Sequence, residues 1–508
     1  MIKKLFLAPA AALLAVAGCG NQGIDASDAA SVQPAQVAAS DLQAAVSDER
    51  VRRFYEARGW EAAWSRRAAS GLVEALRGAA AHGLDPADYV AAVERANRPA
   101  EREAALSLAA LEYAGALANG RVDPNRIRDI YTIPRPDPDL VAGLGQAIEG
   151  GDVGGWLAGL APRDAEYRAL SEAYLRYAGE AERDGSQDIQ GGDRIREGER
   201  DPRVPRIVEA LRANNYLGEA PATGDGALYS APIAAAVRRM QNDHGIAADG
   251  VVGPDTLEAL NTGAAERVRT LAVNLERRRW LQRRPPATRI DVNTAAARLD
   301  YWRDGQHVDA RNVVVGQPGW ETPQLGSPIF RLVANPTWTV PRSIQEEEIE
   351  PKGSGYMARH NMVWRDGWIV QRSGPGNALG EVKFDMRNDH AIYLHDTPAK
   401  NLFAENQRHF SHGCVRVEDA LGFARMLAQA DGKLAQFERA LASGEETFVN
   451  LDANIPVRLV YHTAFVDQGG NIVFRTDPYG WDAELAAALG YDPRQARGLR
   501  RHVSDVGP

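Results

Sequence analysis

The segment HDTPAKNLFAENQRHFSHGCVRVED, residues 395–419, concentrates side chains that can do chemistry. It contains three histidines and Cys414, one of only two cysteines among 508 residues. A thiol attacks as its thiolate, so it needs a proton acceptor or a positive field beside it. His395 follows the strand-like Tyr393 by two residues, and a strand end can fix an imidazole while the following loop folds back. The pattern therefore predicts Cys414 as a nucleophile and His395 as its base.

The residues that flank the cysteine suit acyl transfer. Gly413 has no side chain, so the backbone can approach a substrate, and the amides of Gly413 and Cys414 could point at one oxygen. Arg416 could favour the thiolate or hold a substrate carboxylate. His412 lies two residues before the cysteine and is predicted to support the site.

Two other interpretations of this segment remain open. Zinc binds histidine and thiolate, but the chain has no HExxH and no CxxC motif. A buried structural cysteine beside satisfied histidines is the second, although it would not explain why the small residues Ser411 and Gly413 bracket His412. The zinc ligands would be drawn from His390, His395, His409, His412 and Cys414.

The other cysteine lies in an export signal. Residues 1–19, MIKKLFLAPAAALLAVAGC, have a short basic start, an apolar run too short to span a bilayer, and small residues before a break. The end VAGC resembles the lipobox of bacterial lipoproteins, which implies that Cys19 carries lipid. The alternative is a plain signal peptide with a chance cysteine. If Cys19 is lipidated, Cys414 has no disulfide partner within the chain, which favours a chemical role for it.

Length and composition predict several domains, and the change from helical to strand patterns along the chain predicts a multi-domain α+β protein. A chain of 508 residues with 44% hydrophobic residues has core material for two to four domains. The net charge of -9, with both signs interspersed, argues against nucleic acid as a partner. The expected parts are a signal peptide 1–19, a tether 20–45, an all-α scaffold domain 46–180, a linker 181–203, a three-helix module 204–264, a connecting helix 265–288, a mainly β domain 289–468, and a tail 469–508 with a hairpin strand and a peripheral helix.

The three-helix module carries its own motif. The spacing of its small and polar residues resembles the peptidoglycan-binding module of cell-wall enzymes; these are Gln241, Gly245, Asp249, Gly250, Gly253, Thr256 and Asn261. The alternative is a generic three-helix bundle that serves as a spacer.

The β domain contains a long insertion before the histidine. Residues 335–383 are rich in large aromatics and have helical character around SIQEEEIE. We expect this insertion to wall one side of the cleft around Cys414 as a lid. The alternative, favoured for Trp364 and Trp368 at least equally, is that the aromatics form a small core of their own.

The catalytic segment as a whole resembles the signature of the L,D-transpeptidase family. His395, fifteen further residues, and then SHGCVR match its order and spacing, and NVVVGQP, NPTWTVPRSI, GPGNALGEVKF and IYLHDTPAKNLF resemble its large multi-domain periplasmic members. HGLDPADY and ANGRVDP resemble their helical scaffold domain. The implied fold is a mainly β catalytic domain with an inserted capping segment, plus the scaffold and the peptidoglycan-binding module.

The resemblance also implies a reaction. A cysteine enzyme of this kind takes the acyl group of the third residue of a tetrapeptide stem, releases D-alanine, and passes the acyl group to the amine of another stem. The implied catalytic residues are Cys414, His395, His412 and Gly413, and the implied substrate-binding residues are Arg416, Ser411, Tyr393 and Trp338. Whether the backbone or the side chain of Asp396 orients the base stays open.

The reaction requires no metal and no organic cofactor. Two rival functions are a carboxypeptidase or endopeptidase on the same fold and a non-catalytic lipoprotein that only tethers peptidoglycan. The expected partners are peptidoglycan stems and glycan, and a membrane through the lipid anchor, with no nucleic acid. Gly20 stands where an aspartate often retains lipoproteins at the inner membrane, so we expect a periplasmic protein on the inner leaflet of the outer membrane.

Overall fold

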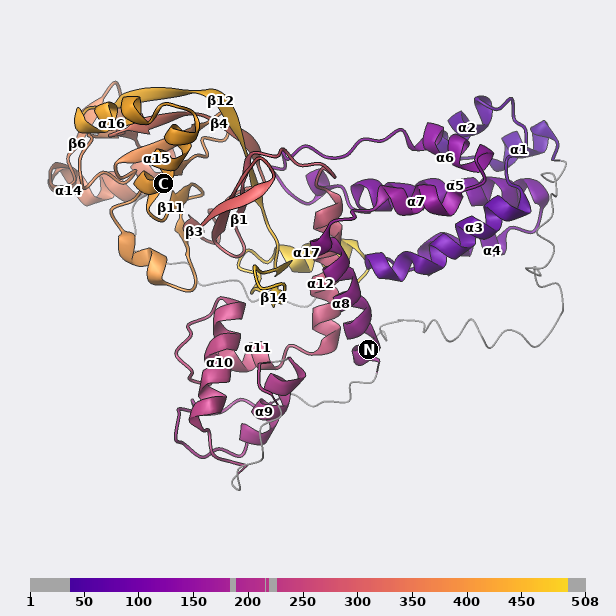
Figure 1. Ribbon diagram of the computed structural model, residues 1–508, viewed down its shortest axis with the longest axis horizontal. Helices are drawn as coiled ribbons and strands as arrows, with labels where there is room; N and C mark the ends of the chain where they lie inside the picture. Colours follow the sequence, from indigo (N-terminus) through magenta and orange to yellow (C-terminus); the bar gives the residue numbers. More distant parts are fainter. Residues whose placement is uncertain (1–36, 183–188, 215, 219–225, 492–508) are drawn as a thin grey trace.

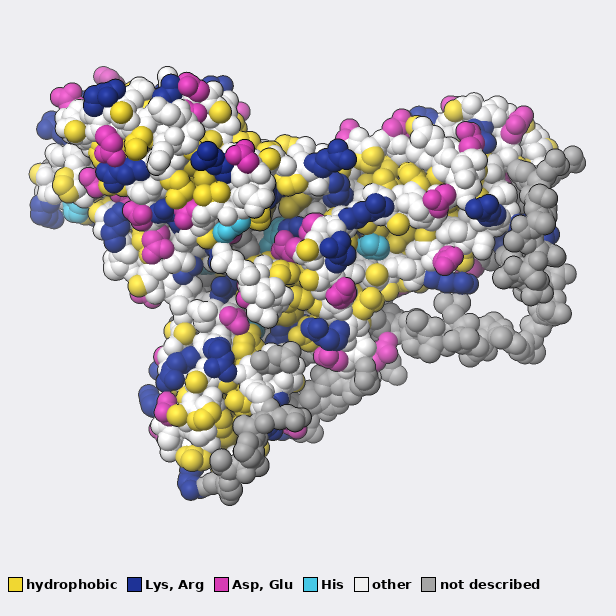
Figure 2. Space-filling view, viewed as in Figure 1, with side chains coloured by type: hydrophobic (Ala, Val, Ile, Leu, Met, Phe, Trp, Pro, Cys, Tyr) yellow, Lys and Arg dark blue, Asp and Glu magenta, His cyan; other side chains and the backbone are white. Residues whose placement is uncertain are grey.

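The computed structural model describes residues 37–182, 189–214, 216–218 and 226–491. A helical scaffold lobe, a small helical module and a β-rich lobe meet around helix α12 (Ala264–Arg279), which stands between them in Figure 1. Basic and acidic side chains are interspersed over all three lobes in Figure 2, as the composition predicts. No helix among these described residues is both long and apolar enough to cross a membrane.

The scaffold lobe is a bundle built around the long helix α5. Small residues along α5, such as Ala110 and Ala114, are fully buried and let the shorter helices approach closely. Side-chain caps begin several of these helices; Asp48, for example, accepts from the amides of Arg50 and Val51. The helices are α1 (Ala39–Ala45), α2 (Glu49–Glu56), α3 (Arg66–Arg77), α4 (Ala87–Arg95), α5 (Pro99–Asn119), α6 (Leu140–Glu149), α7 (Val153–Leu160) and α8 (Ala165–Ala181), with 3₁₀ turns at Gly78–His82 and Pro124–Arg126.

The bundle begins before the predicted end of the tether. Residues 39–45 form α1, whose Leu42 is fully buried in the scaffold core together with Val46. The prediction of a tether up to residue 45 is therefore wrong for these residues, because one leucine and one valine in an alanine-rich stretch suffice to dock a short helix. The signal peptide, Cys19 and the rest of the predicted tether up to residue 36 lie outside the described residues.

The small module packs three helices, α9 (Val204–Ala213), α10 (Ala231–His244) and α11 (Pro254–Leu260), around a core of its own. Its motif residues build this fold. The amide of Gln241 donates to the Val251 carbonyl and to Thr256 Oγ1, both at 3.0 Å, and its oxygen accepts from the Gly250 amide at 2.8 Å. The recurring spacing thus holds the turn between α10 and α11.

The module also includes part of the predicted linker. Ile189 and Ile195 are buried in the module core, and Ile195 pairs with Val252 through two backbone hydrogen bonds. Asn261 makes bonds to both the amide and the carbonyl of Ile189. The prediction of a linker 181–203 is wrong from Ile189 onward, because a segment held by isolated bridges carries no periodic pattern that distinguishes it from a flexible segment.

Helix α12 is the joint of the molecule. Its Arg279 forms a fully buried ion pair with Glu276 at 2.6 Å, and Glu276 also accepts from the Val122 amide of the scaffold at 2.7 Å. Packing against α8 covers another face of α12 in one apolar cluster that includes Leu271 and Leu275. A helix predicted only to connect two domains is therefore part of the core that unites them.

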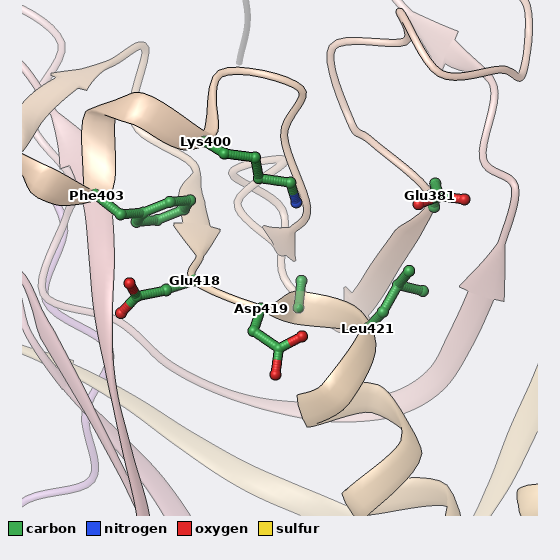
Figure 3. A pocket seen from close by; sticks show the side chains of 7 residues that line it. Glu381, Lys400, Phe403, Glu418, Asp419 and Leu421 are labelled. Carbon is green, nitrogen blue, oxygen red and sulfur yellow. The ribbon is translucent and has the colours of Figure 1, made fainter.

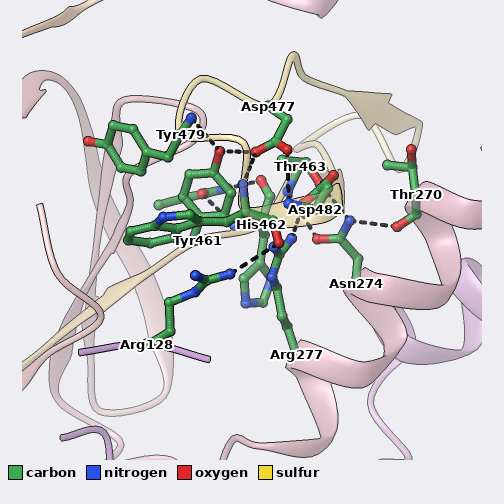
Figure 4. A network of polar contacts seen from close by, with 12 residues as sticks. Arg128, Thr270, Asn274, Arg277, Tyr461, His462, Thr463, Asp477, Tyr479 and Asp482 are labelled. Carbon is green, nitrogen blue, oxygen red and sulfur yellow. Dashed lines mark hydrogen bonds and ion pairs between the residues drawn. The ribbon is translucent and has the colours of Figure 1, made fainter. Parts of the chain in front are cut away.

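The C-terminal helix α17 (Trp481–Ala488) packs into this joint. Figure 4 shows its Asp482 between α12 and the end of the β domain. Arg277 donates to Asp482 at 2.5 Å, and the Thr463 hydroxyl donates to Asp482 at 2.6 Å while accepting from Asn274 at 2.8 Å. The prediction of a peripheral tail is wrong for this helix, because Leu485 and Ala486 are fully buried. The tail beyond Tyr491 lies outside the described residues.

The β domain is a sheet that closes on itself. The strand order is β10-β3-β11-β9-β8-β4-β12-β1-β2, and β2 also pairs with β3. Its interior is filled by alternate strand residues and by one face of α15 (Ala420–Ala430) and α16 (Leu434–Ala442). The strands are β1 (Arg289–Asn293), β2 (Arg298–Arg303), β3 (Gln306–Gly316), β4 (Gly326–Ala334), β8 (Val382–Met386), β9 (Leu394–His395), β10 (His409–Ser411), β11 (Val415–Val417) and β12 (Thr447–Val460).

The predicted hairpin around DQGG forms as β13 (Ala464–Val466) and β14 (Ile472–Phe474), but these strands make a separate two-stranded sheet. Ala464 and Phe474 pack against α8 and α12. The small module contacts this region, because the Thr476 amide donates to the His244 carbonyl and Arg475 donates to the Asn242 carbonyl. The hairpin therefore ties three lobes together.

The insertion leaves the sheet and returns to it at one point, where the Asn335 amide donates to the Glu381 carbonyl at 2.9 Å. Trp338 and Ile349 are buried in a small core of its own. Trp364 is 55% exposed and Trp368 is 37% exposed, so the alternative that placed these two in that core is wrong. The elements are β5 (Trp338–Thr339), α13 (Arg342–Ile344), the π-helical turn η4 (Gln345–Ile349), the 3₁₀ turn η5 (Glu350–Lys352), α14 (Gly353–Arg359), β6 (Met362–Arg365) and β7 (Trp368–Gln371).

Candidate active site

The pleat of three adjacent strands gathers the candidate residues on one face of the sheet. Phe384 of β8, Leu394 of β9 and Val415 of β11 are in register and fully buried in the domain core. Side chains alternate across a strand, so the residues on either side of these three point to the opposite, outer face. They form two rows, Asp385-Tyr393-Cys414 and Lys383-His395-Arg416.

The turn before β11 holds the nucleophile by its backbone. Gly413 has φ +109°, a conformation that a side chain would strain. The Ser411 hydroxyl donates to the Cys414 carbonyl at 2.6 Å and accepts from the Gly413 amide at 3.2 Å. Thr322 donates from Oγ1 to the Gly413 carbonyl at 2.8 Å. The sulfur of Cys414 is thereby presented at a rigid corner.

These bonds change two predicted roles. The Gly413 amide, predicted as an oxyanion donor, is already used by Ser411, so the predicted oxyanion site rests on the Cys414 amide in this arrangement. Ser411, predicted to bind substrate, is fully buried and uses its hydroxyl within the turn. The structure therefore gives Ser411 the task of shaping the turn, because a hydroxyl two or three residues from a backbone group bonds locally.

Burial opposes ionisation of the Cys414 thiol, whereas neighbouring residues favour it. Burial raises the pKa of the Cys414 thiol to about 11, against the opposing effects of the hydrogen bonds from Tyr393 and the charges of Lys383 and Arg416. Cys414 is 4% exposed, and its sulfur lies 3.6 Å from the Ala391 carbonyl oxygen. At neutral pH the thiol is protonated in this state, so attack needs a base.

The structure decides which part of Asp396 orients His395. The Nδ1 atom of His395 lies 2.5 Å from the Asp396 backbone carbonyl. A carbonyl only accepts, so Nδ1 carries the proton and Nε2 is the basic nitrogen. The Asp396 carboxylate is engaged elsewhere, with the Glu381 amide and the Lys400 ammonium. His395 is fully buried.

His412 faces the insertion. Its Nε2 lies 2.6 Å from Oε1 of Glu348 in η4, and its ring makes an edge contact with Trp320 at 4.9 Å between centroids. A carboxylate only accepts, so this Nε2 is a donor in the closed arrangement. The insertion is thus fastened directly to the motif that contains the nucleophile.

The remaining residues predicted for the site are Tyr393, Trp338 and Arg416. Tyr393 is half-buried under the insertion core that contains Trp338, stands next to Cys414 in its row, and lowers the pKa of the Cys414 thiol. Burial raises the pKa of Tyr393 well above its ordinary value, so the hydroxyl stays a donor. Trp338 is 1% exposed and supports Tyr393 from behind, which makes it a wall of the site in this state. Arg416 is buried beside His395.

Sequence reasoning missed four residues at the site. Thr322 and Glu348 bond the nucleophile turn from loops far along the chain, and Lys383 and Asp385 stand in its two rows. No spacing rule points to Thr322 or Glu348. The alternation in VKFDM could have indicated Lys383 and Asp385, because two polar residues around Phe384 share a face.

A separate hollow of about 380 Å³ lies at the other end of β11 (Figure 3). Glu418 and Asp419 follow β11 directly, whereas Cys414 precedes it, so the strand separates the hollow from the sulfur. The lining residues are Glu381, Lys400, Phe403, Glu418, Asp419, Ala420 and Leu421. Within the described parts of the chain, no group of three or more histidine, cysteine, aspartate or glutamate side chains is arranged to hold a metal ion.

Comparison with known families agrees with this geometry. Residues 287–438 match the family model described as the L,D-transpeptidase catalytic domain. This part of the chain is therefore similar to L,D-transpeptidase catalytic domains. Residues 49–174 match a scaffold domain and residues 200–260 match a "Putative peptidoglycan binding domain", so the transpeptidase domain is joined to both.

Individual proteins and solved structures resemble only part of this chain. A Haemophilus influenzae protein named "Putative L,D-transpeptidase" is 33% identical over 223 residues, which cover 39% of this chain and 45% of that protein. An L,D-transpeptidase structure from Stackebrandtia nassauensis shares 15% identity with a TM-score of 0.23 over 54% of this chain and 97% of its own. One from Mycobacterium smegmatis shares 12% identity with a TM-score of 0.20 over 34% of this chain and 58% of its own.

Proposed function

We propose that this protein is an L,D-transpeptidase that cross-links peptidoglycan through a thioester on Cys414. The observation that carries the proposal is the two rows of side chains on the outer face of the sheet, in which Cys414, His395 and Tyr393 come from adjacent strands of a transpeptidase domain. The neighbouring peptidoglycan-binding domain supports the polymer as substrate, because it would raise the local concentration of stem peptides.

The chemistry follows from the chain's own residues. His395 Nε2 takes the thiol proton, and the sulfur attacks the carbonyl of the third stem residue. The oxyanion forms beside the Cys414 amide, and its collapse expels D-alanine, whose amine receives the proton from His395. The amine of a second stem then attacks the thioester, His395 takes one proton from it, and the thiol is restored. Protons and electron pairs balance without a metal or cofactor.

The test uses purified protein and a disaccharide-tetrapeptide. Cross-linked dimers with released D-alanine are expected from the wild type, and neither from Cys414→Ala, which removes the sulfur but little packing. Tripeptide without dimers would instead assign the protein as a carboxypeptidase. Unchanged dimer formation by Cys414→Ala would reject the nucleophile.

We also propose that Cys19 anchors the protein by lipid to the outer membrane and that the folded lobes lie in the periplasm. The VAGC sequence supports this. Cys19→Ser should move the protein from the membrane fraction to the soluble periplasmic fraction without altering cross-linking by the purified protein. A wild type found entirely in the soluble fraction would contradict the anchor.

A further inference from the structure

We propose that Lys383 is a positioning residue of the cysteine site, which holds Tyr393 against Cys414 and places a positive charge beside the sulfur. The inference rests on the proposed acyl-transfer function and adds a residue to its machinery.

The position of Lys383 follows from sheet register. It pairs with His395 across β8 and β9, so it shares the outer face with the nucleophile row. Its ammonium lies 4.2 Å from the centroid of the Tyr393 ring and 2.7 Å from Oδ1 of Asp385. An aromatic face on one side and a carboxylate on the other fix the ammonium in place.

Lys383 acts on the sulfur through Tyr393 and through its charge. A cation on the face of a phenol strengthens its hydroxyl as a donor, and Tyr393 stands next to Cys414 in the same row, where it lowers the pKa of the thiol. The charge of Lys383 also opposes the effect of burial on the Cys414 pKa. Both effects favour the thiolate that attacks.

Asp385 makes the charge of Lys383 necessary. It extends the row of Tyr393 and Cys414, and its carboxylate is neutralised by Lys383 on one side and by Arg331 at 2.5 Å on the other. Without Lys383, part of this negative charge would act on a developing thiolate and disfavour it. The two residues should therefore have opposite effects on the sulfur.

Ionisable groups surround Cys414 from every neighbouring element, and the test must isolate one of them. They are Lys383 and Asp385 of β8, Arg331 of β4, Tyr393 directly before β9, His395 of β9, Arg416 of β11, His412 of the preceding turn, and Glu348 of the insertion. Exchanging Lys383 and Asp385 separately, with opposite expected signs, distinguishes their charges from the rest.

The experiment measures alkylation of Cys414 by iodoacetamide in the full-length protein between about pH 7 and 9. Peptide mass spectrometry separates Cys414 from Cys19. We expect Lys383→Met to slow alkylation roughly threefold to tenfold, which corresponds to a rise of about half to one unit in the thiol pKa. Lys383→Arg should stay within about twofold of the wild type, and Asp385→Asn should be faster. Lys433→Met, which removes a surface partner of Asp452, is the matched control and should change nothing.

The outcomes separate the hypotheses. A Lys383→Met protein that reacts as fast as the wild type, or faster, would overturn the proposal. Slower reaction of both Lys383→Met and Asp385→Asn would also overturn it. A packing defect would slow both variants, whereas the loss of the two opposite charges should change the rate in opposite directions. Lys383→Gln repeats the test if the methionine variant does not fold. Alkylation needs no peptidoglycan, so a protein that alkylates as expected yet forms no dimers rejects only the proposed function.

Discussion

At the scale of single residues, the two histidines of the site have different partners, and their loss should slow acylation to different degrees. His395 donates from Nδ1 to a backbone carbonyl, which leaves Nε2 basic, whereas His412 uses Nε2 toward Glu348. Carbapenems present a strained acyl group that the sulfur can open. We expect His395→Ala to slow carbapenem acylation of Cys414 at least about 100-fold, and His412→Ala to slow it less. Intact-mass kinetics that rank the two in the opposite order would reassign the base.

Tyr393 makes a second prediction at this scale. Tyr393 lowers the pKa of the Cys414 thiol, and we expect its hydroxyl to donate to the thiolate; a hydrogen bond to a charged group contributes about 1.5–3 kcal/mol. Tyr393→Phe keeps the ring beneath Lys383 and removes only the hydroxyl. Carbapenem acylation should slow about tenfold or more, with the circular dichroism spectrum unchanged. An equal rate would mean that the hydroxyl contributes nothing to the thiolate.

At the scale of elements, we expect the insertion to act as a lid that is latched to the active-site motif. One contact joins η4 to the turn before Cys414, the hydrogen bond between Glu348 and His412. Both ends of the insertion meet at Asn335 and Glu381, so the segment can hinge there while its own core stays packed.

Removal of the latch should expose the sulfur. In Glu348→Ala, a bulky maleimide should label Cys414 several-fold faster than in the wild type, because the lid opens more often. Glu347→Ala is the matched control, since Glu347 is its exposed neighbour in the same turn. Equal labelling rates for the two variants would show that the bond between Glu348 and His412 does not hold the lid closed.

At the scale of the whole molecule, buried and half-buried histidines in all three lobes should make the fold sensitive to acid. Burial lowers the pKa of His82 in the scaffold, His244 in the module and His409 in the β domain to about 4, and lowers that of His462 well below its ordinary value. Each must be neutral when folded. A pKa below the unfolded value of about 6.5 gives stability that is complete above that pH and is lost as the pH falls toward 4.

The size of this effect can be measured at one site. His409 is buried and would contribute roughly 3 kcal/mol of the loss by the shift in its pKa. By calorimetry at about pH 7 and 5, the unfolding temperature of the wild type should fall on acidification, and that of His409→Gln should fall less. His390→Gln, an exposed histidine, is the control and should behave as the wild type. An equal fall in all three would exclude His409 as a source of acid sensitivity.

Much of this protein was determined by local sequence. The spacing of His395 and SHGCVR predicts the nucleophile and base, and strands, helices and the insertion follow from patterns within a few residues. The predicted ends of the tether and the linker were wrong where one or two apolar residues dock a short segment, as at Leu42 and Ile195. Burial of a single side chain depends on a surface elsewhere in the chain.

Only the tertiary structure decided how the nucleophile is supported. Thr322 and Gly413 are 91 residues apart and Glu348 and His412 are 64 apart, so no local spacing connects them. Lys383 reaches Tyr393 because strand register and pleat bring β8 beside β9 with both side chains on the outer face. Local sequence sets which residues can react, whereas register and packing set which charges and donors surround the sulfur, because electrostatic effects depend on distance in space rather than along the chain.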